Sequence, residues 1–478
     1  MGSDTEVLRD SNELVTEQLR QARQSLPSWS GRSVKDRLRI IRRARHLIAR
    51  DCEALAATLS HRRPAVETLV TEVLPLVEAA RFLERNAERL LAPRVLRHGR
   101  PLWLLGVRAE VRREPLGVVL ILSPSNYPLF LPGVQILQAL IAGNAVCAKP
   151  APGCAEPLQR FVALLTEAGL PDGVLTVLDE SPETAAAAAR AGFNKILLTG
   201  SAQTGRLVLQ AAAPRLTPAT MELSGNDAVF VLDGADLDLV ASCLAYGLRL
   251  NGGATCIAPR RVFVPGTSVQ RLEQALLSRI GDISPASVPQ RIRIQLQDML
   301  TEAAASGARV LGWPDADRVP PIVVADARDD FRLLREDVFA PVLAIVTVRD
   351  TEQALQAAAS CPYALGASVF GPPAEAYRLA TQVNAGSVVV NDIIVPTADP
   401  RLPFGGRGES GFGVTRGAEG LLELTAVKTI STRRGRFRPH LTAPQPEEAP
   451  RYAALIRLLH GRRSFRGVLS FDRFRQSW

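Results

Sequence analysis

The chain has 478 residues, 46% of them hydrophobic, which is enough for two domains of ordinary size or one large one. No apolar run approaches the length that spans a bilayer, and residues 1–10 are polar and acidic, so neither a membrane-spanning nor a secreted protein is expected. The net charge is +9, but the basic residues are spread along the chain and only 5% of residues are aromatic. This pattern argues against a nucleic-acid-binding surface.

Cysteine usage indicates a reducing compartment. Six cysteines are scattered without the spacing of a disulfide framework: Cys52, Cys147, Cys154, Cys243, Cys256 and Cys361. We therefore expect free thiols and a cytoplasmic location. Neither the cysteines nor the five histidines have the spacing of metal ligands, so no metal site is expected.

Residues 10–95 are predicted to be helical, because apolar residues recur at helical spacing. The pattern then changes to strand character between residues 102 and 122. Trp103–Glu114 alternates loosely, which suits a projecting hairpin. Leu116–Ser123 is a continuous apolar run, typical of a strand buried on both faces.

Strands and helices alternate from Leu116 to Met221, which predicts a parallel sheet with crossover helices. The expected strands are Val118–Leu122, Ala145–Ala148, Val174–Val177, Lys195–Leu198 and Ala219–Leu223. The expected helices are Val134–Ala142, Glu156–Ala168, Pro182–Ala191 and Thr204–Ala213.

Residues 224–425 show the same alternation of strands and helices, so we expect two α/β domains with Cys256 between them. The strands expected here are Ala228–Val231, Arg261–Val264, Val342–Val348, Ala367–Phe370 and Ser387–Val390.

The C-terminal segment differs in composition from the rest. Residues 433–450 are Pro-rich and charged, as in an extended strap, and residues 451–459 fit one amphipathic helix. Residues 451–478 carry seven arginines against one acid, and four aromatic residues that follow the helix: Phe465, Phe471, Phe474 and Trp478. Such a segment either packs on the protein body or a partner subunit, or makes a weak contact with a membrane surface.

Two short motifs carry the chemistry. Glu222 lies in Met221-Glu222-Leu223-Ser224-Gly225, and Cys256 closes Asn251-Gly252-Gly253-Ala254-Thr255-Cys256. A thiol nucleophile and a carboxylate base are what a reaction needs if it forms a thioester and then hydrolyses it. Taken alone, Cys256 fits a buried structural cysteine and Glu222 a surface carboxylate at a strand end. The apolar neighbours of Glu222 favour a partly buried acid with a raised pKa.

Asn126, between Pro124 and Pro128, carries a side-chain amide, a group that can donate a hydrogen bond to an oxyanion. The alternative is a turn residue.

In these motifs the chain resembles the aldehyde dehydrogenase superfamily, and the match extends in family order over roughly residues 30–430. Further motifs that resemble the family's are Pro124–Pro128, Ala142-Gly143-Asn144 with Lys149-Pro150, Thr199-Gly200-Ser201 with Gly205, Phe339-Ala340-Pro341-Val342, and Leu402-Pro403-Phe404-Gly405-Gly406 with Ser410-Gly411.

The resemblance implies an α/β fold of two Rossmann-like domains with a small β oligomerisation element. The cofactor-binding domain would comprise residues 1–96 and 116–222, and the catalytic domain residues 223–425. The oligomerisation hairpin and strand would be residues 97–115 and 426–434, followed by a basic extension at 435–478. A homodimer or homotetramer is implied, and the short N-terminus with the long C-terminal extension resembles the fatty and aromatic aldehyde branch.

The activity implied is the NAD- or NADP-dependent oxidation of an aldehyde to a carboxylic acid. Cys256 would attack the carbonyl to give a thiohemiacetal and then a thioester, Asn126 and the Cys256 amide would bind the oxyanion, and Glu222 would activate water. The alternatives are a CoA-acylating member, which commonly lacks this glutamate, and a non-catalytic scaffold.

The resemblance also implies a cofactor site. Gly200, Ser201 and Gly205 would bind the pyrophosphate at the start of a helix. Lys149 would contact the adenosine ribose; Pro152 stands where many NAD-preferring members have Glu, which makes NADP an alternative.

Phe339 and Asp337 would lie at the nicotinamide, with Asp337 in the place of a family glutamate and Glu336 as its alternative. Ser224, Asn226 and Ser125 also depart from the family pattern.

For the substrate tunnel the resemblance implies a set of mostly apolar residues: Tyr127, Phe130, Thr255 and Ile257. This set favours aliphatic or aromatic aldehydes over anionic semialdehydes.

Overall fold

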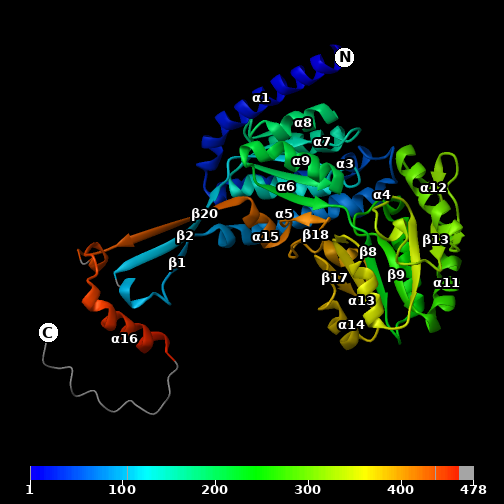
Figure 1. The fold of residues 1–478 in the computed structure, drawn as a ribbon. Coiled ribbons are helices and arrows are strands. Elements are labelled where there is room, and N and C mark those ends of the chain that lie inside the picture. Colours follow the sequence, from blue (N-terminus) through cyan, green and yellow to red (C-terminus); the bar gives the residue numbers. More distant parts are fainter. Residues whose placement is uncertain (1, 105, 437, 462–478) are drawn as a thin grey trace. The chain divides into compact units, whose positions relative to one another are not determined.

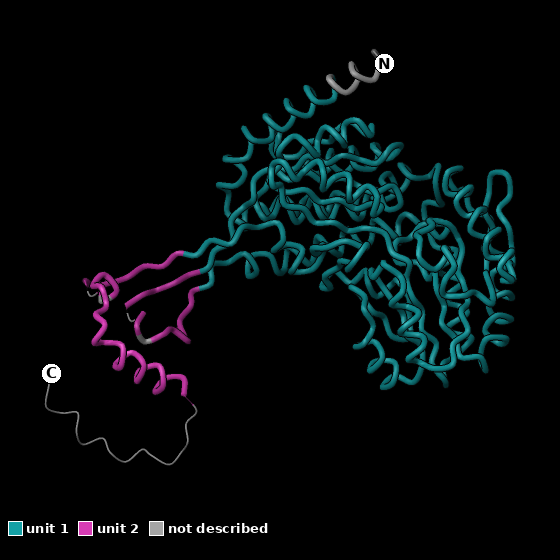
Figure 2. Tube along the Cα trace, viewed as in Figure 1, with its two compact units in different colours: residues 1–94, 111–429 teal, residues 95–110, 430–478 magenta. Residues whose placement is uncertain are grey.

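The computed structural model describes residues 2–104, 106–436 and 438–461 (Figure 1). The chain divides into two compact units, one of residues 1–94 and 111–429 and the other of residues 95–110 and 430–478 (Figure 2). The first unit begins with the expected helical region, interrupted by a π-helical turn at Leu69–Val73. Its helices are α1 (Gly2–Ser30), α2 (Val34–Arg50), α3 (Cys52–Ala57), α4 (Ala65–Thr68) and α5 (Leu74–Leu91).

A six-stranded sheet forms the centre of the first half of this unit. Its spatial order is β19 (Gly411–Phe412), β7 (Ala219–Leu223), β6 (Lys195–Gly200), β3 (Val118–Leu122), β4 (Ala145–Lys149) and β5 (Leu175–Val177). All neighbouring pairs are parallel except β19 with β7. The crossover helices are α6 (Phe130–Ala142), α7 (Ala155–Glu167), α8 (Pro182–Arg190) and α9 (Ala202–Ala212). The predicted parallel sheet and its five strands are confirmed.

Helices cover both faces of this sheet. Val119 and Ile121 point into a core shared with α2, α5, α6 and α7. The alternate residues Val118 and Leu120 point into a second core shared with α1, α8 and α9. Because every residue of β3 is buried, the strand has no polar face, which explains its continuous apolar sequence.

A seven-stranded sheet forms the second half of the unit. Its order is β11 (Arg309–Leu311), β13 (Ile322–Ala325), β14 (Val342–Val348), β9 (Pro259–Pro265), β8 (Asp227–Val231), β16 (Gly366–Phe370) and β17 (Ser387–Val390). Only β11 runs antiparallel to its neighbour. The helices of this half are α10 (Leu237–Arg249), α11 (Gly266–Ile280), α12 (Gln290–Ala305), α13 (Thr351–Ala359) and α14 (Pro373–Ala380). The five predicted strands are confirmed; β11 and β13 were not predicted.

After the second sheet the chain returns to the first. β19 pairs with β7, with Gly411 opposite Glu222, and α15 (Gly417–Glu423) packs against α5 and α6. Gly411 has φ 95°, and a Cβ there would meet the Met221 carbonyl, so the close pairing requires glycine. The sequence grouped these residues with 223–425, whereas the structure adds β19 to the first sheet and packs α15 against helices of that half. The remaining domain boundaries stay a prediction.

A three-stranded sheet has the order β1 (Arg94–Leu96), β2 (Val107–Pro115) and β20 (Thr425–Arg433). The remaining short strands form two separate ladders: β10 (Ala286–Ser287) with β12 (Arg318–Val319), and β15 (Tyr363–Ala364) with β18 (Arg407–Gly408). The predicted hairpin residues therefore form a sheet with the predicted late strand. Its role in oligomerisation stays a prediction.

The last helix among the described residues of the second unit is α16 (Ala449–His460), which contains the predicted helix at 451–459. Its exposed apolar side chains include Tyr452, Leu455 and Ile456. The aromatic residues Phe465, Phe471, Phe474 and Trp478 lie outside the described residues. Within the described ranges, no helix combines the length and the apolar character needed to cross a membrane.

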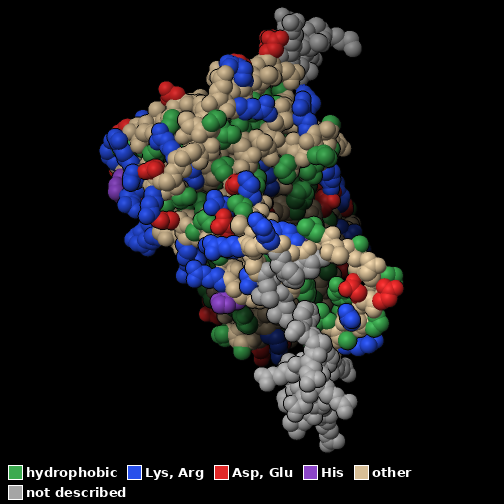
Figure 3. Space-filling view, turned by 90° about the vertical axis from the view of Figure 1, so that its left-hand side faces the viewer, with side chains coloured by type: hydrophobic (Ala, Val, Ile, Leu, Met, Phe, Trp, Pro, Cys, Tyr) green, Lys and Arg blue, Asp and Glu red, His purple; other side chains and the backbone are tan. Residues whose placement is uncertain are grey.

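Figure 3 shows one face of the molecule, on which basic side chains gather along one side with acidic side chains among them. Ion pairs are accordingly frequent at the surface. Arg50, for example, contacts both Asp51 and Glu167.

Candidate active site

The topology of the first sheet places two loops side by side. From β3 the chain proceeds to β4 and β5 in one direction, and then to β6 and β7 in the other, so the order reverses between the neighbours β3 and β6. Ligands of doubly wound folds bind outside the carboxyl ends of the strands at such a point. The loop that begins at Pro124 and the turn at Gly200-Ser201 meet there, and both line a cavity of about 1610 Å³.

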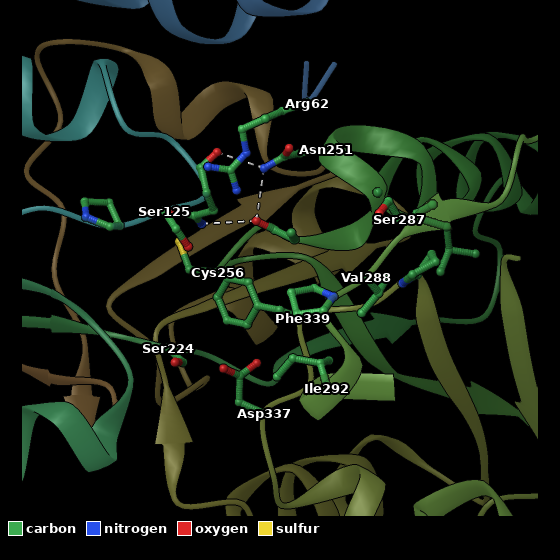
Figure 4. A pocket seen from close by; sticks show the side chains of 18 of the residues that line it. Arg62, Ser125, Ser224, Asn251, Cys256, Ser287, Val288, Ile292, Asp337 and Phe339 are labelled. Carbon is green, nitrogen blue, oxygen red and sulfur yellow. Dashed lines mark hydrogen bonds between the residues drawn. The ribbon is translucent and has the colours of Figure 1, made fainter. Parts of the chain in front are cut away.

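This cavity brings together seven of the residues singled out from the sequence. They are Asn126, Gly200, Ser201, Glu222, Cys256, Asp337 and Phe339. In Figure 4, Cys256 lies with Ser125 and Asn251 on one side of the cavity, and Asp337 and Ser224 lie below Phe339.

Cys256 follows a turn in which three successive residues, Asn251, Gly252 and Gly253, have φ between 48° and 74°. A Cβ at Gly253 would meet Ala340 O and Pro341 Cα at 2.6 Å, so glycine lets the cysteine loop contact the Phe339–Val342 motif. Cys256 as a whole residue is intermediate in exposure. Burial raises its pKa, the Glu222 carboxylate adds to the rise, and the Arg416 guanidinium opposes it. A proton acceptor must therefore help the thiol to react.

Glu222 lies on β7 and is 3% exposed. Its Oε2 accepts a hydrogen bond of 2.7 Å from Thr415 Oγ1, and its Oε1 has no hydrogen-bond partner in the described part of the chain. Burial raises the pKa of Glu222, and Arg416 and Thr415 oppose the rise. The expected raised pKa is confirmed, and a carboxylate with a raised pKa and one free oxygen can accept a proton from a thiol or from water.

Asn126 is held against the cysteine loop. Its Nδ2 donates to Ala254 O at 3.1 Å, and its main-chain carbonyl accepts from Asn251 Nδ2 at 3.0 Å. The side-chain amide thus contacts a residue that is two positions before Cys256 in the cysteine loop. This location suits a hydrogen-bond donor to the oxygen atom of a substrate bound at the thiol.

The other end of the cavity is built by the start of α9. Ser201 is its N-cap, and Ser201 Oγ accepts from Thr204 N at 3.1 Å. The residues of the first helical turn line the cavity, where the helix dipole favours an anion. Gly205 does not line it; a Cβ there would meet Leu223 Cδ1 at 2.9 Å, so this glycine permits helix α9 to pack on β7.

Asp337 and Ser224 form a pair of polar side chains in the cavity wall. The Ser224 hydroxyl donates to the Gly200 carbonyl at 3.4 Å and lies close enough to the Asp337 carboxylate to lower its pKa. Burial raises the pKa of Asp337 to about 6, against the opposing effects of Arg260 and Ser224. Glu336, the alternative considered from the sequence, does not line the cavity and pairs with Arg332 instead.

Asn226 is a third departure from the family pattern, and it supports the segment that carries Asp337. Asn226 Nδ2 donates to Leu333 O at 3.0 Å and to Glu336 O at 2.8 Å. Asn226 therefore fixes the main chain immediately before Asp337.

The other predicted site residues do not line the cavity. Lys149 is buried and donates from Nζ to Glu180 O at 2.7 Å. Tyr127 and Thr255 are buried and joined by a hydroxyl–hydroxyl contact of 2.6 Å. Phe130 lines a small separate cavity beside Arg416. Ile257 is partly buried behind Gly366. The functional roles of these residues remain predictions.

Sequence reasoning missed four buried residues near the site: Arg63, Glu72, Thr415 and Arg416. Only Glu72 had a signal, as a lone acid within the apolar stretch Leu69–Leu76. Within the described residues, no group of three or more His, Cys, Asp or Glu is arranged to hold a metal ion.

The model of the aldehyde dehydrogenase family matches residues 5–430. The chain belongs to the aldehyde dehydrogenase family. Among its relatives in that family, 4,4'-diapolycopene aldehyde oxidase of Methylomonas sp is 30% identical over 473 residues, covering 96% of this chain and 87% of that protein. A putative succinate-semialdehyde dehydrogenase [NADP(+)] of Mycobacterium ulcerans is 31% identical over 438 residues, covering 87% of this chain and 83% of that protein.

Solved structures of the family agree in fold. An aldehyde dehydrogenase of Mycobacterium tuberculosis complexed with NAD+ has a TM-score of 0.81 and 25% identity, covering 88% of this chain and 90% of that one. The two α/β halves described above are thus the two Rossmann-like domains of the aldehyde dehydrogenase fold.

Proposed function

We propose that this protein oxidises an aldehyde to a carboxylic acid with NAD or NADP, through a thiohemiacetal and a thioester on Cys256. The observation that carries the proposal is that Cys256, Glu222 and Asn126 share one cavity with the first turn of α9 and with Asp337. A nucleophile, a base and an amide donor are thus next to a wall suited to an anionic dinucleotide.

The cavity residues fit a nicotinamide dinucleotide. Gly200 and Ser201 would receive the pyrophosphate at the helix start, and the Asp337 carboxylate would accept hydrogen bonds from a ribose. When bound, the cofactor supplies a hydride acceptor. A relative named for NADP and a similar structure holding NAD+ support both cofactors as candidates.

The protein's own groups account for the remaining chemistry. The Cys256 sulfur forms a bond to the aldehyde carbon, and its proton passes to a base, for which Glu222 is the buried candidate in the cavity. The carbonyl oxygen becomes an oxyanion beside Asn126 Nδ2 and the Cys256 main-chain N–H. After oxidation, Glu222 releases the thiol proton to solvent and then takes a proton from water, which attacks the thioester carbon. The carbon–sulfur bond breaks, the acid leaves, and Glu222 returns its proton to the Cys256 sulfur.

The substrate proposal follows from the wall on the cysteine side. The predicted tunnel residues do not line the cavity, and its wall near the cysteine loop includes Arg62, Glu67, Tyr246 and Arg249. We keep the prediction that apolar aldehydes are accepted, and we infer from these side chains that polar groups on them are tolerated. A panel of hexanal, benzaldehyde and succinate semialdehyde separates these classes.

The test follows the absorbance of the reduced cofactor in wild type, Cys256→Ala and Glu222→Gln, with NAD and with NADP. Cys256→Ala should abolish reduction. Glu222→Gln should reduce the cofactor slowly and stop at one reduction per site, because both the proton transfer from the thiol and the hydrolysis of the thioester lose their base.

Turnover of Glu222→Gln restored by CoA would favour the acylating alternative. A folded wild type inactive on every aldehyde, with or without CoA, would contradict the proposal and favour the scaffold.

We also propose that the protein is a homo-oligomer in a reducing compartment, consistent with its six free thiols. The exposed Tyr452, Leu455 and Ile456 of α16 would then be covered by protein. A monomer in light scattering would contradict this. Co-sedimentation with anionic liposomes that is lost on deletion of residues 436–478 would instead support membrane contact.

A further inference from the structure

Glu72 is an acid with no exposed surface in the π-helical turn Leu69–Val73. Its Oε1 accepts a hydrogen bond from Arg63 Nη2. Its Oε2 accepts from the main-chain N–H groups of Leu129 at 2.7 Å and Phe130 at 2.9 Å. These N–H groups open α6, so the carboxylate holds the start of that helix. Single π-helical turns within helices are frequent at functional sites.

Arg63 extends this contact to the loop that carries Asn126. It is 7% exposed, and its Nη2 also donates to the main-chain carbonyl of Asn126 at 3.3 Å. Its guanidinium lies 5.4 Å from the centre of the Tyr127 ring. Its Nε and Nη1 have no hydrogen-bond partner among the described residues.

Stability alone does not explain this arrangement. A buried ion pair is commonly no more stabilising than apolar residues of the same size, because both charges lose their hydration. Here the guanidinium also leaves two nitrogens unpaired, which adds to the cost. The pair instead lies where main-chain placement matters most for the chemistry.

The same helical segment holds the cysteine loop. Glu67 Oε1 accepts from Asn251 N at 2.8 Å, and Asn251 Nδ2 donates to the carbonyl of Asn126, the one that Arg63 contacts. The Tyr127 and Thr255 hydroxyls join the two loops a second time. Residues 63–72 therefore fix both loops that meet at the thiol.

We propose that the Arg63–Glu72 pair is a positioning device for the Asn126 amide, holding it where the oxyanion forms on the substrate. This inference rests on the proposed function. Oxyanion donors act only when they are already in place, and a misplacement of about 1 Å can lower the rate about 100-fold. The pair should therefore affect kcat more than KM.

The test is a double-mutant cycle between Arg63→Gln and Asn126→Ala. Arg63→Gln should lower kcat about 10- to 100-fold with little change in KM. Asn126→Ala should lower kcat about 100- to 1,000-fold, and the double variant should be no slower than Asn126→Ala alone. Arg63→Lys, which keeps the charge, should recover part of the loss and gives a second variant if Arg63→Gln does not fold.

Glu84→Gln is the matched control. Glu84 is 6% exposed at its side chain and pairs with Arg45, but it does not line the cavity. It should lose thermal stability and keep kcat.

Alkylation of Cys256 by iodoacetamide, which forms no oxyanion, is the second readout and should be unchanged in Arg63→Gln. Losses that multiply in the double variant, or alkylation that falls in parallel with kcat, would overturn the inference. If wild type oxidises no aldehyde while alkylation proceeds, the proposed function fails instead.

Discussion

Thr415 Oγ1 donates a hydrogen bond of 2.7 Å to Glu222 Oε2, and this contact joins the returning segment after β19 to the candidate base on β7. A hydrogen bond to the ionised form favours that form, so Thr415 keeps the pKa of Glu222 lower than burial alone would set it.

Thr415→Val should raise the pKa of Glu222 and move the rising limb of the kcat–pH profile to higher pH. A hydrogen bond to a charged group contributes about 1.5 kcal/mol, so kcat near neutral pH should fall about tenfold. Thr415→Ser, which keeps the hydroxyl, should follow wild type. Superimposable profiles of Thr415→Val and wild type would show that this contact does not tune the base.

Arg416 should affect the thiol. Its guanidinium lies 4.1 Å from the centre of the Phe404 ring, donates to Thr397 O, and opposes the raised pKa values of both Cys256 and Glu222. Arg416→Met should therefore raise the thiol pKa further and slow iodoacetamide alkylation at pH 8 about tenfold.

Mass spectrometry of the Cys256 peptide measures this rate without interference from the other thiols. Arg416→Lys keeps the charge and serves as the control. An unchanged alkylation rate in Arg416→Met would mean that the cation does not act on the thiol.

Asp337 should make NAD binding depend on pH. Its pKa of about 6 means that the carboxylate becomes neutral below that pH and accepts hydrogen bonds less strongly. The Kd for NAD, measured by titration calorimetry, should rise as the pH falls from 7 to 5. Asp337→Asn should bind about tenfold more weakly at pH 7 and lose this pH dependence.

Ser224→Ala should move the same transition to higher pH, because Ser224 lowers the Asp337 pKa. Equal binding by wild type and Asp337→Asn at every pH would remove Asp337 from the cofactor site.

The fold could be predicted where the burial of an element determines the pattern of its local sequence. The run Leu116–Ser123 gave β3, because a strand covered on both faces is apolar throughout. β13 was not predicted because Ile322–Ala325 is a run of only four apolar residues. Such a run is too short for its periodicity to distinguish a strand from a helix. The return of residues 411–424 to the first sheet is a long-range pairing, which no local pattern encodes.

The site residues likewise divide into those that short motifs predict and those that only long-range contacts place. Cys256, Glu222 and Asn126 lie in short motifs, and the cavity contains all three. Thr415 and Arg63 act across long separations, of 193 residues to Glu222 and 63 residues to Asn126. Their roles depend on how β19 packs against β7 and on how the π-helical turn packs against the loop of Asn126. No local sequence pattern encodes these long-range contacts.

Asp227 provides a test of buried charge away from the chemistry. Its Oδ1 accepts from Gly366 N at 3.1 Å, and burial raises its pKa to about 7 from an ordinary 3.8. The folded protein therefore holds this proton more tightly than the unfolded chain does. The stabilisation is complete below about pH 4 and is lost as the pH rises towards 7.

Asparagine cannot ionise but still accepts from Gly366. Asp227→Asn should therefore gain stability over wild type between pH 5 and pH 8, by on the order of 2–4 kcal/mol. The measurement is the difference in Tm between the two proteins at each pH, at one scan rate. The exposed Asp298, changed to Asn, should give a difference that is flat with pH. A flat difference for Asp227→Asn as well would mean that this carboxylate is hydrated or neutralised in the folded protein.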